Sequence, residues 1–211
     1  MRTRVKFCGC TNWREAEAAI EAGADAIGMI FAHSSRRIEW EAVCEIAKRL
    51  PPLVTPVGVF ADPKRAEIEA ARDLMPQLVV QLHGNESGTF VSELGGEIVK
   101  VIHVSPTDGT QRLAHRCEEF TEALVMFDTA RQDGHAGGGT GIAFAWEHVA
   151  PIARLRPIVV AGGLTPENVG ECVRAVRPFA VDARSGIETN GKKDRVKMEA
   201  FIQAVREADE A

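Results

Sequence analysis

The sequence predicts an α/β fold, a single (β/α)8 TIM barrel spanning residues 1–211, and three observations lead to it. Short apolar runs alternate with helix-like segments eight times along the chain. A length of 211 residues with 45% hydrophobic content suits one buried core of this kind. Glycines and polar residues follow the apolar runs, at the end of each strand where a parallel barrel collects its functional side chains.

The elements are expected in strict alternation. Strands are predicted at 4–9, 26–31, 54–60, 78–82, 98–103, 124–127, 157–160 and 179–181. The first helix has a capped start at Asn12 with Glu15 and an end at Gly23. Further helices are predicted at 40–50, 86–94, 110–120 and 144–152, and a stripe of apolar residues (Met198, Phe201, Ile202, Val205) marks the last one.

Two more helix starts are predicted from their capping residues. Asp62 and Pro63 suit the N-cap and first turn of a helix that continues to about residue 74. The segment from Thr165 to Asn168 is expected to cap the helix after the seventh strand. The one long irregular stretch, 129–141, is rich in glycine and is expected to be a functional loop or lid, although a plain surface loop is nearly as good an interpretation.

An open doubly wound sheet has the same alternation and is the alternative architecture. Such a sheet usually carries G-x-G-x-x-G after an early strand, whereas here the first strand leads into Cys8-Gly9-Cys10. The count of eight strand–helix units also favours the barrel. Residues 186–193 resemble a phosphate-binding P-loop until Lys193 takes the place of the magnesium-binding Ser or Thr. This segment is interpreted as a loop before the last helix.

Composition narrows the function classes. A formal net charge of -5 argues against broad nucleic-acid binding, and no segment approaches the ~20 apolar residues that span a bilayer. No signal peptide is recognised, which predicts a cytoplasmic protein. The five cysteines lack the spacing of a disulfide framework, and the Cys8–Cys10 pair has no second pair to complete a zinc site, so no metal is expected.

The predicted strand ends carry a candidate site. Gly162 and Gly163 after the seventh strand, with Ser185 and Gly186 after the eighth, let backbone N–H groups approach an anion and predict a phosphate site. A turn alone explains Gly162 and Gly163 about equally well, but a second such turn after the eighth strand strengthens the phosphate interpretation.

Cys8 and Asp128, at the ends of the first and sixth strands, are the candidates for proton transfer. A cysteine acts as a base only as thiolate, and an aspartate acts as an acid only if burial raises its pKa. Taken singly, a buried cysteine is usually inert and such an aspartate often caps a turn. Together they predict an acid/base pair.

These residues lie within a series of short motifs that resembles the phosphoribosylanthranilate isomerase family, in order and over nearly the whole chain. The motifs are Lys6-Phe7-Cys8-Gly9-Cys10-Thr11-Asn12, Ser35-Arg36-Arg37, Val57-Gly58-Val59-Phe60, Gln81-Leu82-His83-Gly84, Phe127-Asp128-Thr129, Gly138-Gly139-Thr140-Gly141, Ala161-Gly162-Gly163-Leu164 and Val181-Asp182 with Ser185-Gly186-Ile187-Glu188. The resemblance implies a (β/α)8 barrel that isomerises N-(5-phosphoribosyl)anthranilate by an Amadori rearrangement in tryptophan biosynthesis, without a cofactor and with a phosphorylated sugar as its partner.

The resemblance also implies roles for individual residues. Asp128 is the implied general acid, Cys8 the implied base, and Arg37 the implied partner of the anthranilate carboxylate. The implied phosphate-binding residues are Gly139, Gly162, Gly163, Ser185 and Gly186, and those near the sugar or the catalytic groups are Asp182 and His83. The chain departs from the family pattern at Arg184, where a serine is common, at Cys10, and in a longer segment 130–137.

Three other functions fit part of the pattern. A Schiff-base aldolase needs a lysine in the cavity, and Lys100 is the predicted candidate deep within a strand. A related histidine-pathway isomerase has aspartate where Cys8 stands. A degenerate barrel would bind a phosphorylated metabolite without converting it, and the presence of both Cys8 and Asp128 argues against that.

Overall fold

The computed structural model describes residues 2–129 and 144–211 and has eight parallel strands closed into a barrel. The strands are β1 (Arg4–Cys8), β2 (Ala26–Ile30), β3 (Thr55–Phe60), β4 (Val79–Leu82), β5 (Ile98–Val104), β6 (Leu124–Thr129), β7 (Ile158–Val160) and β8 (Ala180–Ala183). Their order around the barrel is their order in the chain, and β1 closes on β8 with Lys6 opposite Asp182. The predicted (β/α)8 architecture is confirmed.

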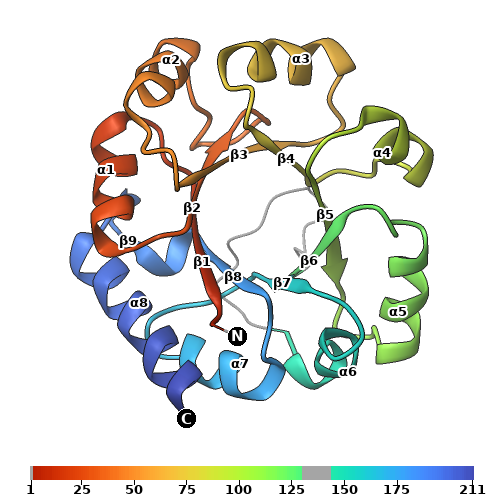
Figure 1. Cartoon of the computed structure of the whole chain (residues 1–211). Coiled ribbons are helices and arrows are strands. Elements are labelled where there is room, and N and C mark those ends of the chain that lie inside the picture. The colour runs from red at the N-terminus through yellow and green to blue at the C-terminus, as the bar shows by residue number, and fades with distance from the viewer. Residues whose placement is uncertain (1, 130–143) are drawn as a thin grey trace.

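Helices surround the barrel on its outside (Figure 1). They are α1 (Trp13–Ala22), α2 (Trp40–Arg49), α3 (Arg65–Leu74), α4 (Gly88–Leu94), α5 (Thr110–Glu118), α6 (Ala150–Ala153), α7 (Val169–Val176) and α8 (Arg195–Glu210). Asn12 and Gly23 cap α1 as predicted, Asn12 through its side chain and Gly23 with a left-handed φ of 107°. The helix predicted at 144–152 is a 3₁₀ turn, Trp146–His148, followed by the short α6.

The predicted N-cap at Asp62 is wrong. Helix α3 begins at Arg65, and Asp62 has a left-handed φ of 48°. Its carboxylate accepts a hydrogen bond from the backbone N–H of Asn85 at 2.7 Å, across the gap to the next strand–helix connection. The carboxylate oxygen that would accept a capping hydrogen bond from the helix therefore accepts one from a residue distant in sequence instead.

The turn before α7 also differs in detail from the expectation. The helix begins at Val169, and its N-cap Asn168 makes no side-chain capping bond. Instead, Asn168 Oδ1 accepts from the Thr165 N–H at 2.8 Å and its Nδ2 donates to the Gly163 carbonyl at 2.9 Å. The segment therefore stabilises the turn after β7 rather than the first turn of the helix.

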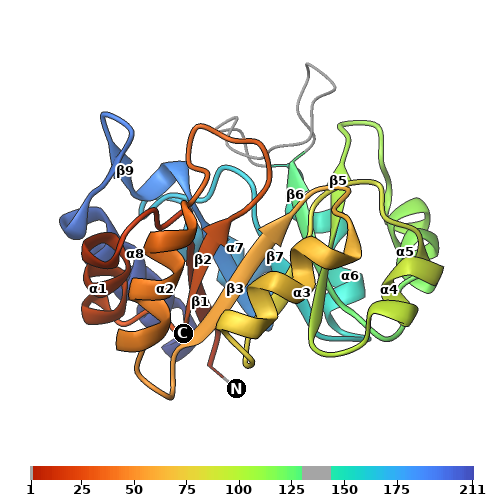
Figure 2. The ribbon, with the colours of Figure 1, turned by 90° about the horizontal axis from the view of Figure 1, so that it is seen from above.

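The predicted loop at 186–193 holds regular structure. A 3₁₀ turn (Ser185–Ile187) leads into a small antiparallel hairpin of β9 (Glu188–Thr189) and β10 (Lys192–Lys193). Figure 2 shows this hairpin at the end of the barrel opposite the N-terminus. The lid predicted within 129–141 lies, beyond Thr129, outside the described residues.

Strand alternation separates an outer core from the barrel interior. Val125 and Phe127 of β6 belong to the large cluster that includes the helix residues Leu113 and Ile152. Met126, between them, packs inside the barrel with residues of neighbouring strands (Val99, Val101, Val159, Ala161, Ala180). Cys8 packs with Ile30 and Val59 in a separate interior cluster.

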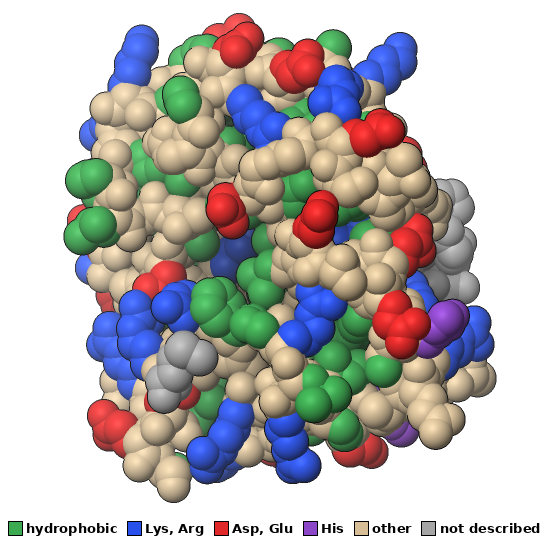
Figure 3. Space-filling view, turned by 45° about the vertical axis from the view of Figure 1, so that its right-hand side comes forward, with side chains coloured by type: hydrophobic (Ala, Val, Ile, Leu, Met, Phe, Trp, Pro, Cys, Tyr) green, Lys and Arg blue, Asp and Glu red, His purple; other side chains and the backbone are tan. Residues whose placement is uncertain are grey.

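Charged side chains of both signs are interspersed over the face shown in Figure 3. No helix among the described residues is long and apolar enough to cross a membrane.

Candidate active site

The two predicted catalytic residues and two of the predicted substrate-binding residues lie at the carboxyl-terminal ends of barrel strands. Cys8 is the last residue of β1, Asp128 is the penultimate residue of β6, and Asp182 lies in β8. His83 follows β4 directly. Because all eight strands are parallel in a closed barrel, these ends form one rim, and the structure brings the four residues to it.

Cys8 is buried, with 5% of its surface exposed. Burial raises the pKa of its thiol above the ordinary value, Lys6 lowers it, Asp182 raises it, and Lys193 and Arg184 lower it. The thiol therefore sits among several charges whose effects oppose one another.

Lys6 is a functional candidate that the sequence reasoning missed. Its Nζ donates to Asp182 Oδ1 at 2.8 Å, and both side chains are more than 90% buried. Lys6 lies two residues before Cys8 on β1, so both side chains face the barrel interior. That two-residue spacing was the available sequence signal.

Asp128 is buried, and its surroundings favour the protonated form of its carboxyl group. Burial raises its pKa to about 7, and the Asp182 carboxylate adds to the rise. A backbone hydrogen bond from Thr129 and the charges of Arg184 and Lys6 act in the opposite direction. Near pH 7 a substantial fraction of Asp128 is therefore protonated.

His83 lies beside this carboxyl group, with its Nε2 3.6 Å from Asp128 Oδ2. Burial lowers the pKa of His83 to about 3, helped by the charges of His103, Lys6, Arg184 and Lys100, so the ring is neutral at pH 7. Both ring nitrogens are buried without a hydrogen-bond partner. His103 Nε2 lies 3.0 Å from the His83 carbonyl oxygen, and the two rings meet edge to face at 4.8 Å.

Gly162 makes room for Asp128. A Cβ atom on Gly162 would lie 2.4 Å from Thr129 Oγ1, 2.5 Å from the Thr129 nitrogen and 2.8 Å from Asp128 Oδ1. Gly162 and Gly163 also have left-handed φ values of 83° and 66°, which other residues rarely adopt. The turn after β7 is thus packed directly against the candidate acid.

Gly186 brings the turn after β8 against the turn after β7. A Cβ atom there would lie 1.9 Å from the Leu164 carbonyl oxygen, a contact that no side chain tolerates. Ser185 and Gly186 are therefore close to the Gly162–Gly163 turn, as the predicted phosphate site requires. Gly139, the remaining predicted phosphate-binding residue, lies outside the described residues.

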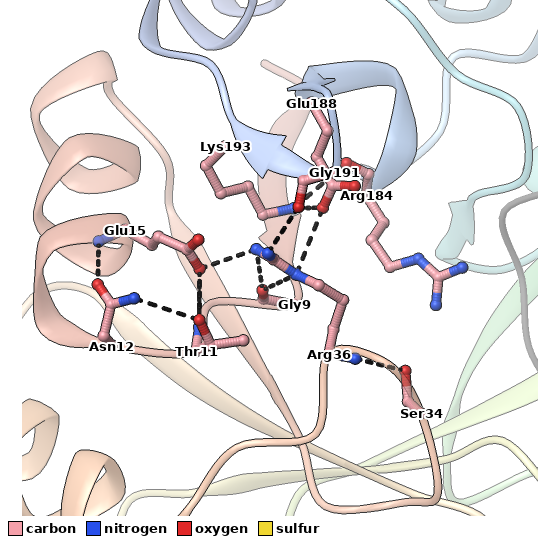
Figure 4. Close-up of polar contacts among 10 residues, drawn as sticks. All are labelled: Gly9, Thr11, Asn12, Glu15, Ser34, Arg36, Arg184, Glu188, Gly191 and Lys193. Atoms are coloured by element: carbon pink, nitrogen blue, oxygen red, sulfur yellow. Dashed lines mark hydrogen bonds and ion pairs between the residues drawn. The ribbon is translucent and has the colours of Figure 1, made fainter.

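The two adjacent arginines of the loop after β2 have different surroundings. Arg36 points inward and donates to the carbonyl of Gly9 at 2.9 Å, the carbonyl of Gly191 at 2.9 Å and Glu15 Oε2 at 2.8 Å (Figure 4). Its side chain is 14% exposed and also lies 3.6 Å from Glu188. Arg36 therefore ties the segment after Cys8 to α1 and to the β9–β10 hairpin.

Arg37, the predicted carboxylate partner, is exposed. It lines a cavity of about 330 Å³ between the loop after β2 and α3, together with the aromatic residues Phe31, Trp40 and Phe60. The rings of Phe31 and Phe60 stack in this cavity wall at 4.8 Å. The residues that line this cavity include none of the rim residues Cys8, His83, Asp128 and Asp182.

Lys100, the candidate lysine of the alternative Schiff-base aldolase, does not face the barrel interior. Val99 and Val101 face the interior, so Lys100 between them extends from the outer face of β5. Its Nζ donates to Glu86 Oε2 at 2.6 Å and to the Gly84 carbonyl at 2.7 Å. Lys6, in contrast, extends from β1 into the barrel interior.

All five cysteines are free thiols. Within 2–129 and 144–211, no group of three His, Cys, Asp or Glu side chains is arranged to hold a metal ion.

The sequence and the fold are similar to those of one group of proteins. Residues 5–204 match the family described as N-(5'phosphoribosyl)anthranilate (PRA) isomerase. The chain is 40% identical over 208 residues to an N-(5'-phosphoribosyl)anthranilate isomerase of Moorella thermoacetica, covering 98% of this chain and 91% of that protein. It is 41% identical to the protein of the same name from Nitrosococcus oceani, covering 97% of this chain and 98% of the relative.

Solved structures give the same result. The crystal structure of phosphoribosyl anthranilate isomerase from Thermotoga maritima has a TM-score of 0.86 and 35% identity, covering 97% of this chain and 99% of that one. A second structure, with a TM-score of 0.83 and 34% identity over 97% of this chain and 99% of that one, holds phosphoribosyl anthranilate isomerase in complex with reduced 1-(o-carboxyphenylamino)-1-deoxyribulose 5-phosphate.

Proposed function

The chain belongs to the N-(5'-phosphoribosyl)anthranilate isomerase family, and from this premise we propose that Asp128 and Cys8 are the acid and the base of its reaction. The chain is an isomerase of N-(5'-phosphoribosyl)anthranilate in tryptophan biosynthesis. Its more specific class is that of an aldose–ketose isomerase, an intramolecular oxidoreductase, acting in the cytoplasm.

The reaction begins at Asp128. Its carboxyl group donates a proton to the ribose ring oxygen as the bond between that oxygen and carbon 1 breaks, and the anthranilate nitrogen forms a protonated Schiff base with carbon 1. Asp128 is left as the carboxylate. Its pKa of about 7 supports this role, because the group holds a proton near neutral pH and can release it.

The second proton transfer belongs to Cys8. Its thiolate removes the proton from carbon 2, and the electron pair of that bond forms the double bond of an enolamine while the Schiff-base nitrogen is neutralised. The enolamine gains a proton at carbon 1 and loses its hydroxyl proton to become the ketone, 1-(2-carboxyphenylamino)-1-deoxyribulose 5-phosphate. Carbon 2 is oxidised and carbon 1 is reduced, so the reaction needs no external oxidant or reductant.

The remaining predicted residues bind the two ends of the substrate. Gly162 and Gly163, with Ser185 and Gly186, would receive the phosphate through backbone N–H groups, together with Gly139. The contact between the two turns supports this site. Arg37 would pair with the anthranilate carboxylate through its planar guanidinium group.

His83 and Asp182 would contact the sugar hydroxyls or the catalytic groups. The two buried, unpartnered ring nitrogens of His83 support a ligand contact. Asp182 already accepts from Lys6 at 2.8 Å, so its second oxygen is the one available to a substrate hydroxyl.

The observation that carries the proposal is the buried, proton-holding Asp128 on the same rim as a buried thiol. The test follows the loss of phosphoribosylanthranilate fluorescence with the purified protein. We expect turnover by the wild type and none by Cys8→Ala/Asp128→Asn. A folded wild type that binds the substrate without consuming it would instead support a degenerate barrel.

A further inference from the structure

Lys6 and Cys8 meet at one point of the barrel wall, opposite Gly28. A Cβ atom on Gly28 would lie 2.8 Å from Cys8 Sγ and 3.1 Å from Lys6 Nζ. Gly28 is paired with Cys8 in the register of β1 and β2. Because Gly28 has no side chain, the Lys6 ammonium and the Cys8 sulfur both approach the space that a Cβ atom would fill.

Asp182 holds the ammonium in that place. Lys6 lies opposite Asp182 in the β1–β8 register, and its Nζ donates to Oδ1 at 2.8 Å. Burial lowers the pKa of Lys6, but Asp182 and Cys8 raise it by more, so the net direction is upward and the amine stays charged. A fixed positive charge thus lies beside the thiol in a region that excludes water.

We propose that Lys6 is a positioning residue of the isomerase, which stabilises the thiolate of Cys8 and is itself fixed by the buried pair with Asp182. The proposal rests on the proposed role of Cys8 as the base. In this arrangement Lys6 supplies the positive charge, and Asp182 fixes its position while opposing part of its effect on the thiolate.

Within the described part of the chain, four charged groups have the largest effects on the pKa of the Cys8 thiol. Lys6 on β1 and Asp182 on β8 have opposite effects on its pKa, Lys6 lowering it and Asp182 raising it. Lys193 on β10 and Arg184 after β8 also lower it. Lys6 has the largest influence of the four, which makes it the residue to change first.

The experiment measures the pKa of Cys8 in the free enzyme, without substrate. The rate of alkylation by iodoacetamide is followed from pH 6 to 11, and mass spectrometry of peptides isolates Cys8 from the other four cysteines. We expect Lys6→Met to raise the pKa of Cys8 by about 1 unit or more, and Asp182→Asn to lower it.

The opposite signs separate the proposal from a merely structural role. If Lys6 only held the wall together, either variant would loosen the site, hydrate the thiol and lower its pKa. A pKa of Cys8 that is unchanged or lowered in Lys6→Met would overturn the proposal. Circular dichroism establishes that each variant tested is folded.

A second comparison serves if Lys6→Met fails to fold, since that change leaves a buried carboxylate without its partner. The double variant Lys6→Met/Asp182→Asn is then compared with Asp182→Asn. We expect a higher pKa of Cys8 in the double variant, and an equal or lower one would refute the role of Lys6.

The matched control is a second buried lysine pair, Lys100 with Glu86, on the outer side of the wall. The double variant Lys100→Met/Glu86→Gln should leave the pKa of Cys8 unchanged. The alkylation rate is measured without turnover, so the role of Lys6 can be tested even if the isomerase assay shows no activity.

Discussion

Replacing the proposed acid should make the protein more stable at alkaline pH. In the native state Asp128 has a pKa of about 7, against an ordinary value of 3.8. Above pH 4 the unfolded chain releases this proton, but the native state keeps it until the pH passes about 7. The protonated Asp128 therefore makes its full contribution to stability below pH 4. This contribution is lost progressively between pH 4 and about pH 7, and none of it remains above that.

The size of the effect follows from the shift in pKa. A rise of about 3 units is equivalent to about 4 kcal/mol between the two protonation states, as an upper bound for a buried group. Between pH 5 and pH 8 the loss is about 2 to 3 kcal/mol. Asp128→Asn keeps the shape of the side chain and remains neutral, so it avoids this loss.

The assay is urea unfolding of the wild type and Asp128→Asn at pH 5 and pH 8. We expect the free energy of unfolding of the variant, relative to the wild type, to increase by about 2 to 3 kcal/mol from the lower to the higher pH. Titrating groups that do not interact with Asp128 behave alike in both proteins and cancel. An equal difference at the two pH values, or a change in the opposite direction, would refute the idea that burial keeps Asp128 protonated.

The other predictions concern turnover and binding. Cys8→Ala and Asp128→Asn should each lower turnover by about 100- to 10,000-fold with an unchanged circular dichroism spectrum, and near-normal turnover would remove that residue from the mechanism. Arg37→Ala should mainly raise KM because it removes a carboxylate partner, so an unchanged KM and rate would contradict its role. Gly162→Ala should lower both stability and kcat, because its Cβ atom would displace Asp128. The control is Gly191→Ala, where φ is also left-handed at 72° but the added Cβ atom would have no neighbour within 4 Å, so this change introduces only backbone strain. Equal losses of kcat in the two alanine variants would show that contact with Asp128 is irrelevant.

For Asp62 and Lys100, the residue type and its position in the sequence were read correctly, but the surroundings that decide the role of the side chain come from the fold. Asp62 has the residue type and position of an N-cap, yet its carboxylate bonds to Asn85 on the next connection. Lys100 lies within a strand as predicted, but only the alternation of Val99 and Val101 shows that it faces outward. Local patterns identify what a side chain is able to do, and the neighbours that folding brings decide which option is used.

The sequence by itself determined the barrel and the identity of its rim residues. Eight alternating apolar runs leave few arrangements that bury them all, and parallel strands necessarily bring Cys8, Asp128 and Asp182 to one end. Their chemical states were decided by the tertiary structure alone. The proton on Asp128, the neutral ring of His83 and the ammonium of Lys6 beside Cys8 depend on burial and on charges from strands distant in sequence. Ionisation responds to the loss of hydration on burial and to the fields of charges a few ångströms away, and neither effect arises until the chain has folded around these groups.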